Sequence, residues 1–336
     1  MSLLKRTYSR SQEVLVTGAG GFIGSHVVEN LVKSGFKVTA LAHYNSRADY
    51  GWLASLDKEL KDSVEIVLGD ITDSELMRTL TSNKEIVVNL AALIAIPYSY
   101  VAPRSYLNTN IIGTMNICEA VRSNDSRMIQ FSTSEVYGTP KTVPITENHN
   151  LNPQSPYAAS KSAADQICIS YHKSFDLKVT VLRPFNTYGP RQSMRAIIPT
   201  IINQFISRNG EINIGNLTPK RDFTFVEDTA AAVQLIAKNQ NFFGETIQLG
   251  TGKAYSIQEV VDLCEKISGK KAKLNPDSKR VRPTKSEVEI LLSDPSNAKK
   301  RLNWEPTTNF EEGLQKTYAW FQKNQSLYGD SESYFI

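Results

Sequence analysis

Four side chains in the middle of the sequence have the types and spacing needed to move a proton at an alcohol carbon. Tyr157 and Lys161 are four residues apart in a stretch of helical character, so both point to one face of the helix. An ammonium beside a phenol favours the phenolate, which suits Tyr157 to act as a general base. Thr133 and Glu135 follow a β-rich run at residues 128–132 and add a hydroxyl and a carboxylate. A Tyr/Lys pair alone is often only an exposed helix face, so its meaning depends on the other motifs.

A glycine-rich turn near the start of the chain has the form of a dinucleotide-binding site. The run Thr-Gly-Ala-Gly-Gly-Phe-Ile-Gly at residues 17–24 follows an apolar stretch and opens a helix-like stretch. Glycines allow a tight turn and close approach of the backbone to a pyrophosphate, and a helix N-terminus offers free N–H groups. The alternative is a βα turn that holds no ligand. We expect a nicotinamide dinucleotide to contact Gly18, Gly21, Phe22, Ile23 and Gly24.

The ends of the following strands predict the rest of the cofactor site. An acidic residue about 20 positions after the turn usually binds the ribose of NAD, but residues 41–47 contain no carboxylate. His43 or Arg47 would instead meet the 2′-phosphate of NADP, so the sequence leans toward NADP and leaves NAD open. Asp70, followed by Ile71, either accepts a hydrogen bond from adenine or caps a helix. Another strand is followed by small or apolar residues, Leu90, Ala91 and Ala92. Either these residues let the cofactor lie against the backbone, or they only pack in the core.

The hydrophobic pattern indicates the elements that must position these residues. Helix-length stretches, notably at residues 104–122 and 156–175, lie between short apolar runs. Strands that alternate with helices form a parallel sheet with crossovers, so we predict an α/β fold with a doubly wound parallel sheet. The expected strands lie at residues 13–17, 37–41, 64–68, 85–90, 128–132 and 179–183.

After about residue 183, prolines and glycines interrupt this rhythm, as expected of a smaller C-terminal α/β domain. We place a first domain at residues 1–185 and a second at residues 186–336. A helix at residues 227–238 and a strand at residues 246–249 are expected to return to the first domain, so the division is not a single cut.

Composition excludes several classes of protein. The 336 residues are 40% hydrophobic and 21% charged, as in soluble globular chains. A formal charge of +4 is too small to indicate a nucleic-acid partner. No apolar run is long enough for a membrane span, and residues 1–10 lack the apolar core of a secretory signal, so we expect a cytoplasmic protein. Cys118, Cys168 and Cys264 are far apart, which argues against a metal site or a disulfide framework.

Together these motifs resemble the extended short-chain dehydrogenase/reductases that modify nucleotide sugars. The resemblance implies a Rossmann domain, a C-terminal domain that holds a nucleoside diphosphate sugar, and a permanently bound nicotinamide. It also implies a homodimer joined through the helices at residues 104–122 and 156–175. The matching segments cover nearly the whole chain: residues 17–24, 133–138, 157–161, LRPFNTYGPR at 182–191, RDFTFVED at 221–228 and LNWEP at 302–306.

The resemblance also implies a role for each candidate catalytic residue. Tyr157 would take the 4-hydroxyl proton of the sugar as hydride leaves C4, Thr133 would hold the 4-oxygen, and Lys161 would hold the ribose and tune Tyr157. A sugar 4-epimerase has no task for Glu135, whereas a 4,6-dehydratase needs a base for the C5 proton before water leaves C6 and hydride returns there. We therefore predict a 4,6-dehydratase with Glu135 as the base. The alternative is that Glu135 is a surface carboxylate.

Ser134 departs from the pattern of dTDP-glucose dehydratases, which typically carry Asp there as the acid for the departing water. Either Glu135 serves as both base and acid, or Ser134 relays a proton through water. Ser134 matches GDP-mannose dehydratases. Segments at residues 43–46, 51–53 and 282–288 resemble dehydratases that act on nucleotide-linked N-acetylglucosamine in legionaminic acid synthesis. The predicted substrate is UDP- or GDP-N-acetylglucosamine.

Four residues occupy family positions that contact the sugar or the diphosphate: Asn186, Arg191, Arg221 and Arg282. The planar fork of arginine can bind two phosphate oxygens at once. For each arginine the alternative is a solvated surface charge.

Three other functions stay open. UDP-glucuronate decarboxylases also carry a Ser-Glu pair, and sugar-nucleotide 4-epimerases share the Tyr/Lys pair. A dinucleotide-binding regulator would keep the fold without the chemistry, although it would have no use for a base such as Glu135.

Overall fold

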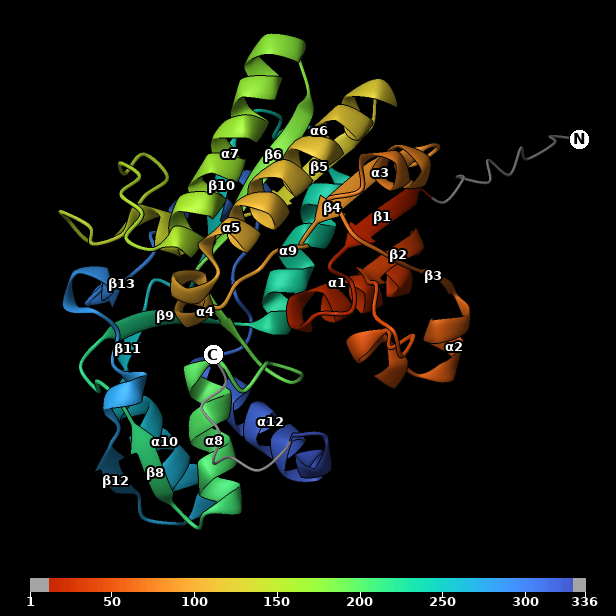
Figure 1. Ribbon diagram of the computed structural model, residues 1–336. Coiled ribbons are helices and arrows are strands. Elements are labelled where there is room, and N and C mark those ends of the chain that lie inside the picture. Colours follow the sequence, from red (N-terminus) through yellow and green to blue (C-terminus); the bar gives the residue numbers. More distant parts are fainter. Residues whose placement is uncertain (1–11, 329–336) are drawn as a thin grey trace, which may run out of the picture.

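The computed structural model describes residues 12–328 and contains a seven-stranded parallel sheet (Figure 1). The strand order is β10-β6-β5-β4-β1-β2-β3, with parallel pairing throughout. This order confirms the predicted doubly wound Rossmann-like sheet. The strands are β1 Glu13–Thr17, β2 Lys37–His43, β3 Val64–Gly69, β4 Ile86–Asn89, β5 Arg127–Phe131, β6 Lys178–Pro184 and β10 Thr246–Leu249.

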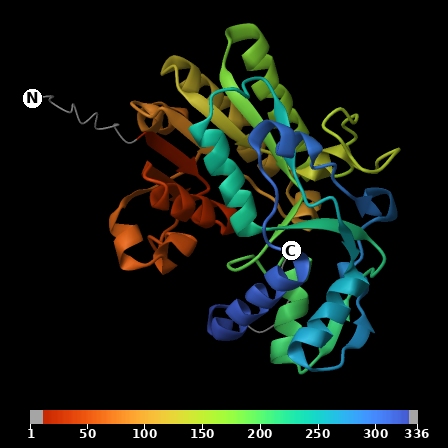
Figure 2. The ribbon, with the colours of Figure 1, turned by 180° about the vertical axis from the view of Figure 1, so that it is seen from behind.

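Helices cover both faces of the sheet, because its central strands are apolar on both sides. On one face α1 and α9 pack together with α11, and on the other α6 packs between α3 and α7. Figure 2 shows α1 and α9 from behind. The helices of this domain are α1 Phe22–Lys33, α2 Lys58–Asp62, α3 Ser74–Thr81, α4 Ile96–Val101, α5 Pro103–Tyr106, α6 Gly113–Ser123, α7 Pro156–Phe175, α9 Val226–Lys238 and α11 Ser296–Leu302.

The two long helices predicted beside each other differ in regularity. The helix predicted at residues 156–175 is continuous as α7. The one predicted at residues 104–122 is a helical path in which α5 leads into a π-helix, Leu107–Ile112, and then into α6. Gly113 lies at this junction, where a Cβ would press on the side chain of Ile71.

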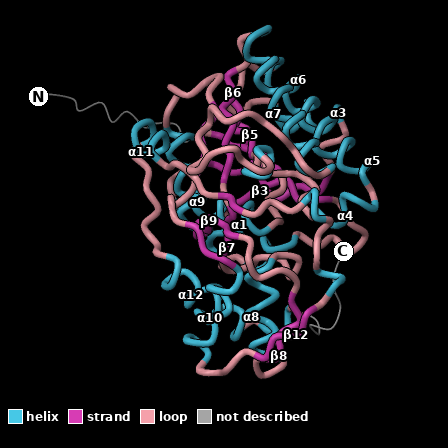
Figure 3. The backbone as a smooth tube through the Cα atoms, turned by 90° about the vertical axis from the view of Figure 1, so that its left-hand side faces the viewer, coloured by secondary structure: helices cyan, strands magenta, loops and turns pink. Residues whose placement is uncertain are grey.

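The second lobe lies below the carboxyl edge of the sheet (Figure 1) and has its own core. Aromatic rings dominate that core, with Phe223 stacked on Phe310 and Tyr188 set edge-on to both. Figure 3 shows the β8–β12 pair at the far end of the lobe. The elements of the lobe are β7 Asn186–Tyr188, α8 Ile197–Ser207, β8 Glu211–Ile214, β9 Lys220–Phe225, β11 Ala254–Ser256, α10 Ile257–Ser268, β12 Lys273–Pro276, β13 Ile290–Leu291 and α12 Phe310–Lys323.

The chain crosses between the sheet and the lobe more than once. After β9 in the lobe, α9 packs against α1, and β10 pairs with β6 and forms one edge of the sheet. The helix and strand expected at residues 227–238 and 246–249 thus lie with the seven-stranded sheet and its covering helices.

An aromatic cluster joins the lobe to the first domain. The ring of Trp52, which follows β2, lies 5.5 Å from Trp320 of α12 and 6.0 Å from Tyr328. The Tyr328 hydroxyl donates to the carbonyl of Gln192 at 3.1 Å. The backbone N–H of Trp52 donates to the carbonyl of Gly20 at 2.9 Å, so the cluster is tied directly to the glycine-rich turn.

Candidate active site

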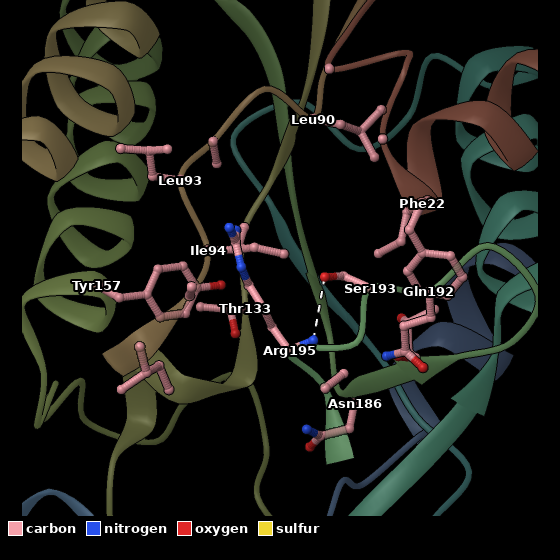
Figure 4. A pocket seen from close by; sticks show the side chains of 18 of the residues that line it. Phe22, Leu90, Leu93, Ile94, Thr133, Tyr157, Asn186, Gln192, Ser193 and Arg195 are labelled. Carbon is pink, nitrogen blue, oxygen red and sulfur yellow. Dashed lines mark hydrogen bonds between the residues drawn. The ribbon is translucent and has the colours of Figure 1, made fainter. Parts of the chain in front are cut away.

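A cavity of about 900 Å³ lies between the carboxyl ends of the strands and the C-terminal lobe. Ligands of open α/β sheets bind at this edge, and the volume suits a large organic ligand. In Figure 4, Tyr157 and Thr133 point into the cavity from one side, Phe22 lies on the other, and Arg195 reaches between them. The lining includes most of the residues predicted from the sequence: Gly18, Gly21, Phe22, Ile23, Gly24, His43, Asp70, Ile71, Leu90, Ala91, Ala92, Thr133, Glu135, Tyr157, Lys161, Asn186, Arg221 and Arg282.

The glycine-rich turn between β1 and α1 leaves no room for side chains. Gly18 has a φ of +65°, and a Cβ there would lie 2.7 Å from the amide nitrogen of Ala91. A Cβ on Gly24 would collide with the carbonyl oxygen of Gly18. Helix α1 begins after Gly21 with no side-chain cap and no acidic residue in its first turn, so its N-terminus favours an anion. This cradle fits the pyrophosphate of the predicted dinucleotide.

The loop after β2 forms the end of the cavity where the adenosine of such a cofactor would lie. His43 Nδ1 is 3.5 Å from Asp70 Oδ2, and both residues line the cavity. Asp70 Oδ1 also accepts a hydrogen bond from the backbone N–H of Thr72 at 2.8 Å, so Asp70 stabilises a turn as well as facing the cavity. Arg47 is exposed and is not part of the lining, so this structure does not support its predicted contact with a 2′-phosphate.

Asp49, which lies in the same loop, was assigned no role in the prediction from sequence. It lies two positions beyond the stretch in which a ribose-binding carboxylate was sought, and it lines the cavity. Its Oδ1 accepts a hydrogen bond from the N–H of Gly51 at 2.7 Å. The absence of a carboxylate was the basis of the lean toward NADP, and Asp49 weakens that basis.

The predicted catalytic pair is held by the start of α7 and the end of β5. Ser155 caps α7 by accepting a hydrogen bond from the N–H of Ala158 at 3.1 Å, which starts the helix just before Tyr157. Tyr157 and Lys161 are both buried along the same helix face. The Thr133 hydroxyl lies close enough to the phenol to lower the pKa of Tyr157, and both side chains line the cavity, so a sugar hydroxyl placed here would meet both groups.

The electrostatic effect of Lys161 on Tyr157 differs from the prediction. Burial raises the pKa of Tyr157, the Thr133 hydrogen bond lowers it by less, and the nearby Glu135 raises it further. Lys161 donates its hydrogen bond to the carbonyl of Phe131 rather than to the phenol, and burial lowers the pKa of its own ammonium. In this structure desolvation has the largest effect on the pKa of Tyr157 and favours the neutral phenol.

Glu135 is a cavity residue rather than a surface carboxylate. It lies in a short 3-10 helix, Ser134–Tyr137, which begins as Thr133 Oγ1 accepts a hydrogen bond from the N–H of Glu135 at 3.2 Å. Its side chain is only 12% exposed and faces the cavity. Ser134 is 2% exposed and does not line the cavity, so its placement does not support the predicted proton relay.

Two arginines and two carboxylates form a charged cluster on the lobe side of the cavity. Arg221 Nη2 donates to Glu287 Oε1 at 3.0 Å. Arg282 Nη1 lies 3.7 Å from Glu287 Oε1 and 3.9 Å from Glu135 Oε1, too far for a good hydrogen bond to either. Among the described residues, buried Arg282 Nη1 and Asn186 Oδ1 have no hydrogen-bond partner. Unpaired polar atoms at a cavity wall indicate a polar ligand.

Arg191 is placed differently from the prediction. Its φ is +70°, and Nη2 pairs with Glu29 of α1 at 3.0 Å while Nη1 donates to the Ser25 hydroxyl at 3.3 Å. Arg191 is not part of the cavity lining. It joins the segment after β7 to α1, because the left-handed backbone turns its side chain toward that helix.

Two cavity residues, Glu287 and Arg195, carried no role in the prediction. Glu287 belongs to the segment at residues 282–288. It was overlooked because its partner Arg221 reaches it only through the pairing of β13 with β9. Arg195 follows the LRPFNTYGPR motif by four residues and reaches into the cavity (Figure 4). A charged residue shortly after a motif was the only signal the sequence offered.

Within residues 12–328 no group of three or more His, Cys, Asp or Glu side chains is arranged to hold a metal ion. No helix in that range is long and apolar enough to cross a membrane.

The sequence matches the GDP-mannose 4,6 dehydratase family over residues 15–317. A UDP-glucuronate 4-epimerase from Thermodesulfobacterium geofontis is 33% identical over 322 residues, which cover 93% of this chain and 97% of that protein. Similarity therefore extends over the glycine turn, the predicted catalytic residues and the lobe.

Solved structures of two kinds of enzyme have the same fold. The UDP-glucuronic acid 4-epimerase from Bacillus cereus, in complex with UDP-4-deoxy-4-fluoro-glucuronic acid and NAD, superposes with a TM-score of 0.85 at 30% identity, covering 94% of this chain and 100% of the other. The dTDP-glucose 4,6-dehydratase DesIV from Streptomyces venezuelae, with NAD bound, gives a TM-score of 0.85 at 25% identity, covering 96% and 100%. Both neighbours bind NAD, and one is an epimerase while the other is a dehydratase.

Proposed function

The chain belongs to the GDP-mannose 4,6-dehydratase family of nicotinamide-dependent nucleotide-sugar enzymes, and we propose that within this family it is a 4,6-dehydratase. Glu135 carries the proposal, because a nearly buried carboxylate lines the same cavity as Tyr157 and Thr133. The resemblance of the segment at residues 282–288 supports UDP- or GDP-N-acetylglucosamine as the substrate and legionaminic acid synthesis as the setting.

The first step is oxidation of the sugar at C4. A bound nicotinamide supplies the hydride acceptor for C4 and later the donor for C6, and the glycine-rich turn and Lys161 would hold it. Tyr157 takes the proton of the 4-hydroxyl as general base, and Thr133 keeps the oxygen in place by a hydrogen bond. Because burial raises the pKa of Tyr157, this step needs the charge of Lys161 nearby to stabilise the phenolate.

The second step is loss of water across C5 and C6. The 4-keto group acidifies C5, and Glu135 takes the C5 proton while the electrons of that bond form the C5–C6 double bond. The C6–O bond breaks, and Glu135 returns a proton so that the hydroxyl leaves as water. Ser134 is not needed, in keeping with its burial outside the cavity lining. Hydride then reaches C6, C5 gains a proton that balances the one taken by Tyr157, and the product is a 4-keto-6-deoxy sugar.

A 4-epimerase is the second candidate, favoured by the names of similar relatives. Epimerisation needs only Thr133, Tyr157 and Lys161, and it leaves Glu135 without a role. A UDP-glucuronate decarboxylase would use the same first step and then release carbon dioxide.

A panel of nucleotide sugars with product mass spectrometry separates these functions. We expect UDP- or GDP-N-acetylglucosamine to lose one water and to give a 4-keto product with strong absorbance in alkali. A product of unchanged mass but altered C4 configuration would establish an epimerase. Carbon dioxide release from UDP-glucuronate would establish a decarboxylase, and no change in any donor would favour a regulator.

The form of the cofactor is a separate proposal. The lean toward NADP rests on His43 and Arg47, whereas Asp49 in the lining supports NAD. Dissociation constants for the two dinucleotides test this point directly, and clearly tighter binding of NAD would overturn the lean.

We also propose a homodimer through the outer faces of α6 and α7 and the π-helix between α5 and α6. Apolar side chains on this surface are exposed in the single chain: Leu107, Ile112, Met115 and Phe175. Contiguous apolar residues on a helical face mark an interaction site. Ile112→Glu should convert the dimer to a monomer in sedimentation analysis, and a monomeric wild-type chain would contradict the proposal.

A further inference from the structure

A buried carboxylate behind the cavity connects the elements that carry the catalytic residues. Asp165 is fully buried on α7, four residues after Lys161 and eight after Tyr157. Its Oδ2 accepts a hydrogen bond from the Ser132 hydroxyl at 2.7 Å and another from Arg183 Nε at 3.0 Å. One oxygen atom therefore links α7 to the ends of β5 and β6.

The partners of Asp165 adjoin the other reacting groups. Ser132 directly precedes Thr133 in the chain. Arg183 Nη1 donates to the Tyr137 hydroxyl at 3.0 Å, and the Arg183 guanidinium lies over the Tyr137 ring. Tyr137 ends the short 3-10 helix that carries Glu135. Asp165 therefore connects the three elements that carry Tyr157, Thr133 and Glu135.

Stability alone does not explain a charge at this position. A buried ion pair loses most of its attraction to desolvation, and apolar residues of similar volume often do as well or better. Asp165 Oδ1 also has no hydrogen-bond partner among the described residues, which adds a cost. Burial raises the pKa of Asp165, while Arg183 and the hydrogen bond from Ser132 act to lower it. A carboxylate retained at this cost is best explained by its effect on neighbouring groups. The titratable and charged groups that face it are Lys161, Tyr157 and Cys168 from α7, Arg183 from β6 and Tyr137 from the 3-10 helix.

We propose that Asp165 is a positioning residue, which holds α7, Thr133 and the Glu135 turn in register and places a carboxylate near Lys161 and Tyr157. The link to Glu135 rests on the proposed function. The link to Tyr157 and Lys161 holds for a dehydratase, an epimerase or a decarboxylase, because all three begin by oxidising C4.

The electrostatic part has a definite sign. The charge of Asp165 raises the pKa of Lys161 and contributes to the raised pKa of Tyr157. A neutral amide at this position should lower both pKa values. Lys161 would then lose its proton at a lower pH, and Tyr157 would reach the phenolate at a lower pH, so both limbs of the pH–rate profile move toward acid. A residue with a purely structural role would reduce turnover without moving either limb.

The test is Asp165→Asn in the full chain with cofactor bound, measured in two ways. Turnover against pH should show kcat reduced by about 100-fold with KM little changed, because small displacements of reacting groups have effects of that order, and both limbs should shift to lower pH. Tyr157 ionisation should shift the same way in ultraviolet difference spectra, taken with and without Tyr157→Phe. The spectra need no substrate, so they give an answer even if the dehydratase proposal fails.

Asp228→Asn is the matched control. Asp228 is also buried, and it accepts hydrogen bonds from Thr307 and Thr308 away from the cavity. Its replacement should lower the melting temperature without moving either titration. If Asp165→Asn does not fold, Ser132→Ala removes one hydrogen bond from Asp165 and should lower kcat by about tenfold, with smaller shifts in the same direction. Titrations that stay at the wild-type pH in the variants that fold would overturn the proposal.

Discussion

The two polar clusters around the cavity differ in how completely their hydrogen bonds are made. Behind the cavity, the Ser132 hydroxyl and Arg183 Nε donate to Asp165 at 2.7 and 3.0 Å, and all three residues are buried. On the lobe side, Arg282 lies 3.7 and 3.9 Å from its two carboxylate neighbours. In the inner cluster one oxygen of Asp165 binds both partners at hydrogen-bond distance, whereas in the outer cluster Arg282 Nη1 makes no hydrogen bond and is free for a ligand. Preformed support behind the reacting groups and unsatisfied groups in front of them are what a rigid catalytic site requires.

The largest effect should come from Tyr157→Phe, because this phenol lies where the two clusters meet. Loss of a general base typically lowers turnover by about 100- to 10,000-fold, and we expect the upper part of that range. The fold should be unaffected, because phenylalanine keeps the ring that packs against Tyr106 and loses only the hydroxyl. Steady-state kinetics with the active donor, and circular dichroism as a control, measure this. Turnover within about tenfold of wild type would show that Tyr157 is not the base.

Glu135→Gln should separate elimination from oxidation. We expect a loss of water-eliminating turnover of about 100- to 1,000-fold, while binding of donor and hydride transfer from C4 continue. Solvent deuterium at C5 of the product, read by mass spectrometry, follows the Glu135 step directly. Full turnover with normal deuterium incorporation at C5 would show that a group other than Glu135 takes the C5 proton, and turnover without deuterium at C5 would indicate an epimerase.

Arg282→Gln should weaken binding more than chemistry. A charged hydrogen bond to phosphate is worth about 1.5–3 kcal/mol, so KM should rise about 10- to 100-fold with kcat nearly unchanged. Thermal stability should not fall, because Arg282 Nη1 makes no hydrogen bond in the free protein. Arg301→Gln is a control, since Arg301 pairs with Glu245 outside the cavity. A fall in kcat with unchanged KM would show that Arg282 supports the reacting groups, as Asp165 is proposed to do, rather than binding the substrate.

The smallest effects should come from the cofactor loop. His43 lines the cavity and Arg47 does not, and both are exposed. Exposed charges contribute about 1 kcal/mol or less, so His43→Ala should weaken NADP binding by up to about fivefold and Arg47→Ala by less. Calorimetric titration with NAD and NADP measures both. A larger loss for Arg47→Ala would restore the predicted 2′-phosphate contact.

The parts of the fold and site that the sequence predicted correctly are those determined by local pattern. Apolar runs with helices between them were enough to predict the parallel sheet. The positions of strand ends were enough to predict that Thr133, Glu135 and Tyr157 lie at one edge of it. The four-residue spacing of Tyr157 and Lys161 was enough to place both on one helix face.

The parts that could not be predicted depend on side-chain direction and on distant partners. Arg191 belongs to a recognisable motif, yet its left-handed backbone turns it to Glu29, about 160 residues earlier in the chain. Glu287 gains its place only when β13 pairs with β9. The pKa of Tyr157 also depends on the packed structure. Desolvation raises it, and the spacing of residues in the sequence does not show which side chains are desolvated.

The aromatic cluster between the domains provides an optical probe of the cavity. The chain has three tryptophans, and two of them, Trp52 and Trp320, lie 5.5 Å apart across the boundary between the first domain and the lobe. The third, Trp304, is buried elsewhere with its indole N–H donated to the carbonyl of Asp228. Any separation of the lobe from the glycine-rich turn must part the first two rings and wet them, while Trp304 stays dry. Intrinsic fluorescence would therefore report opening and closing around a ligand without an attached dye.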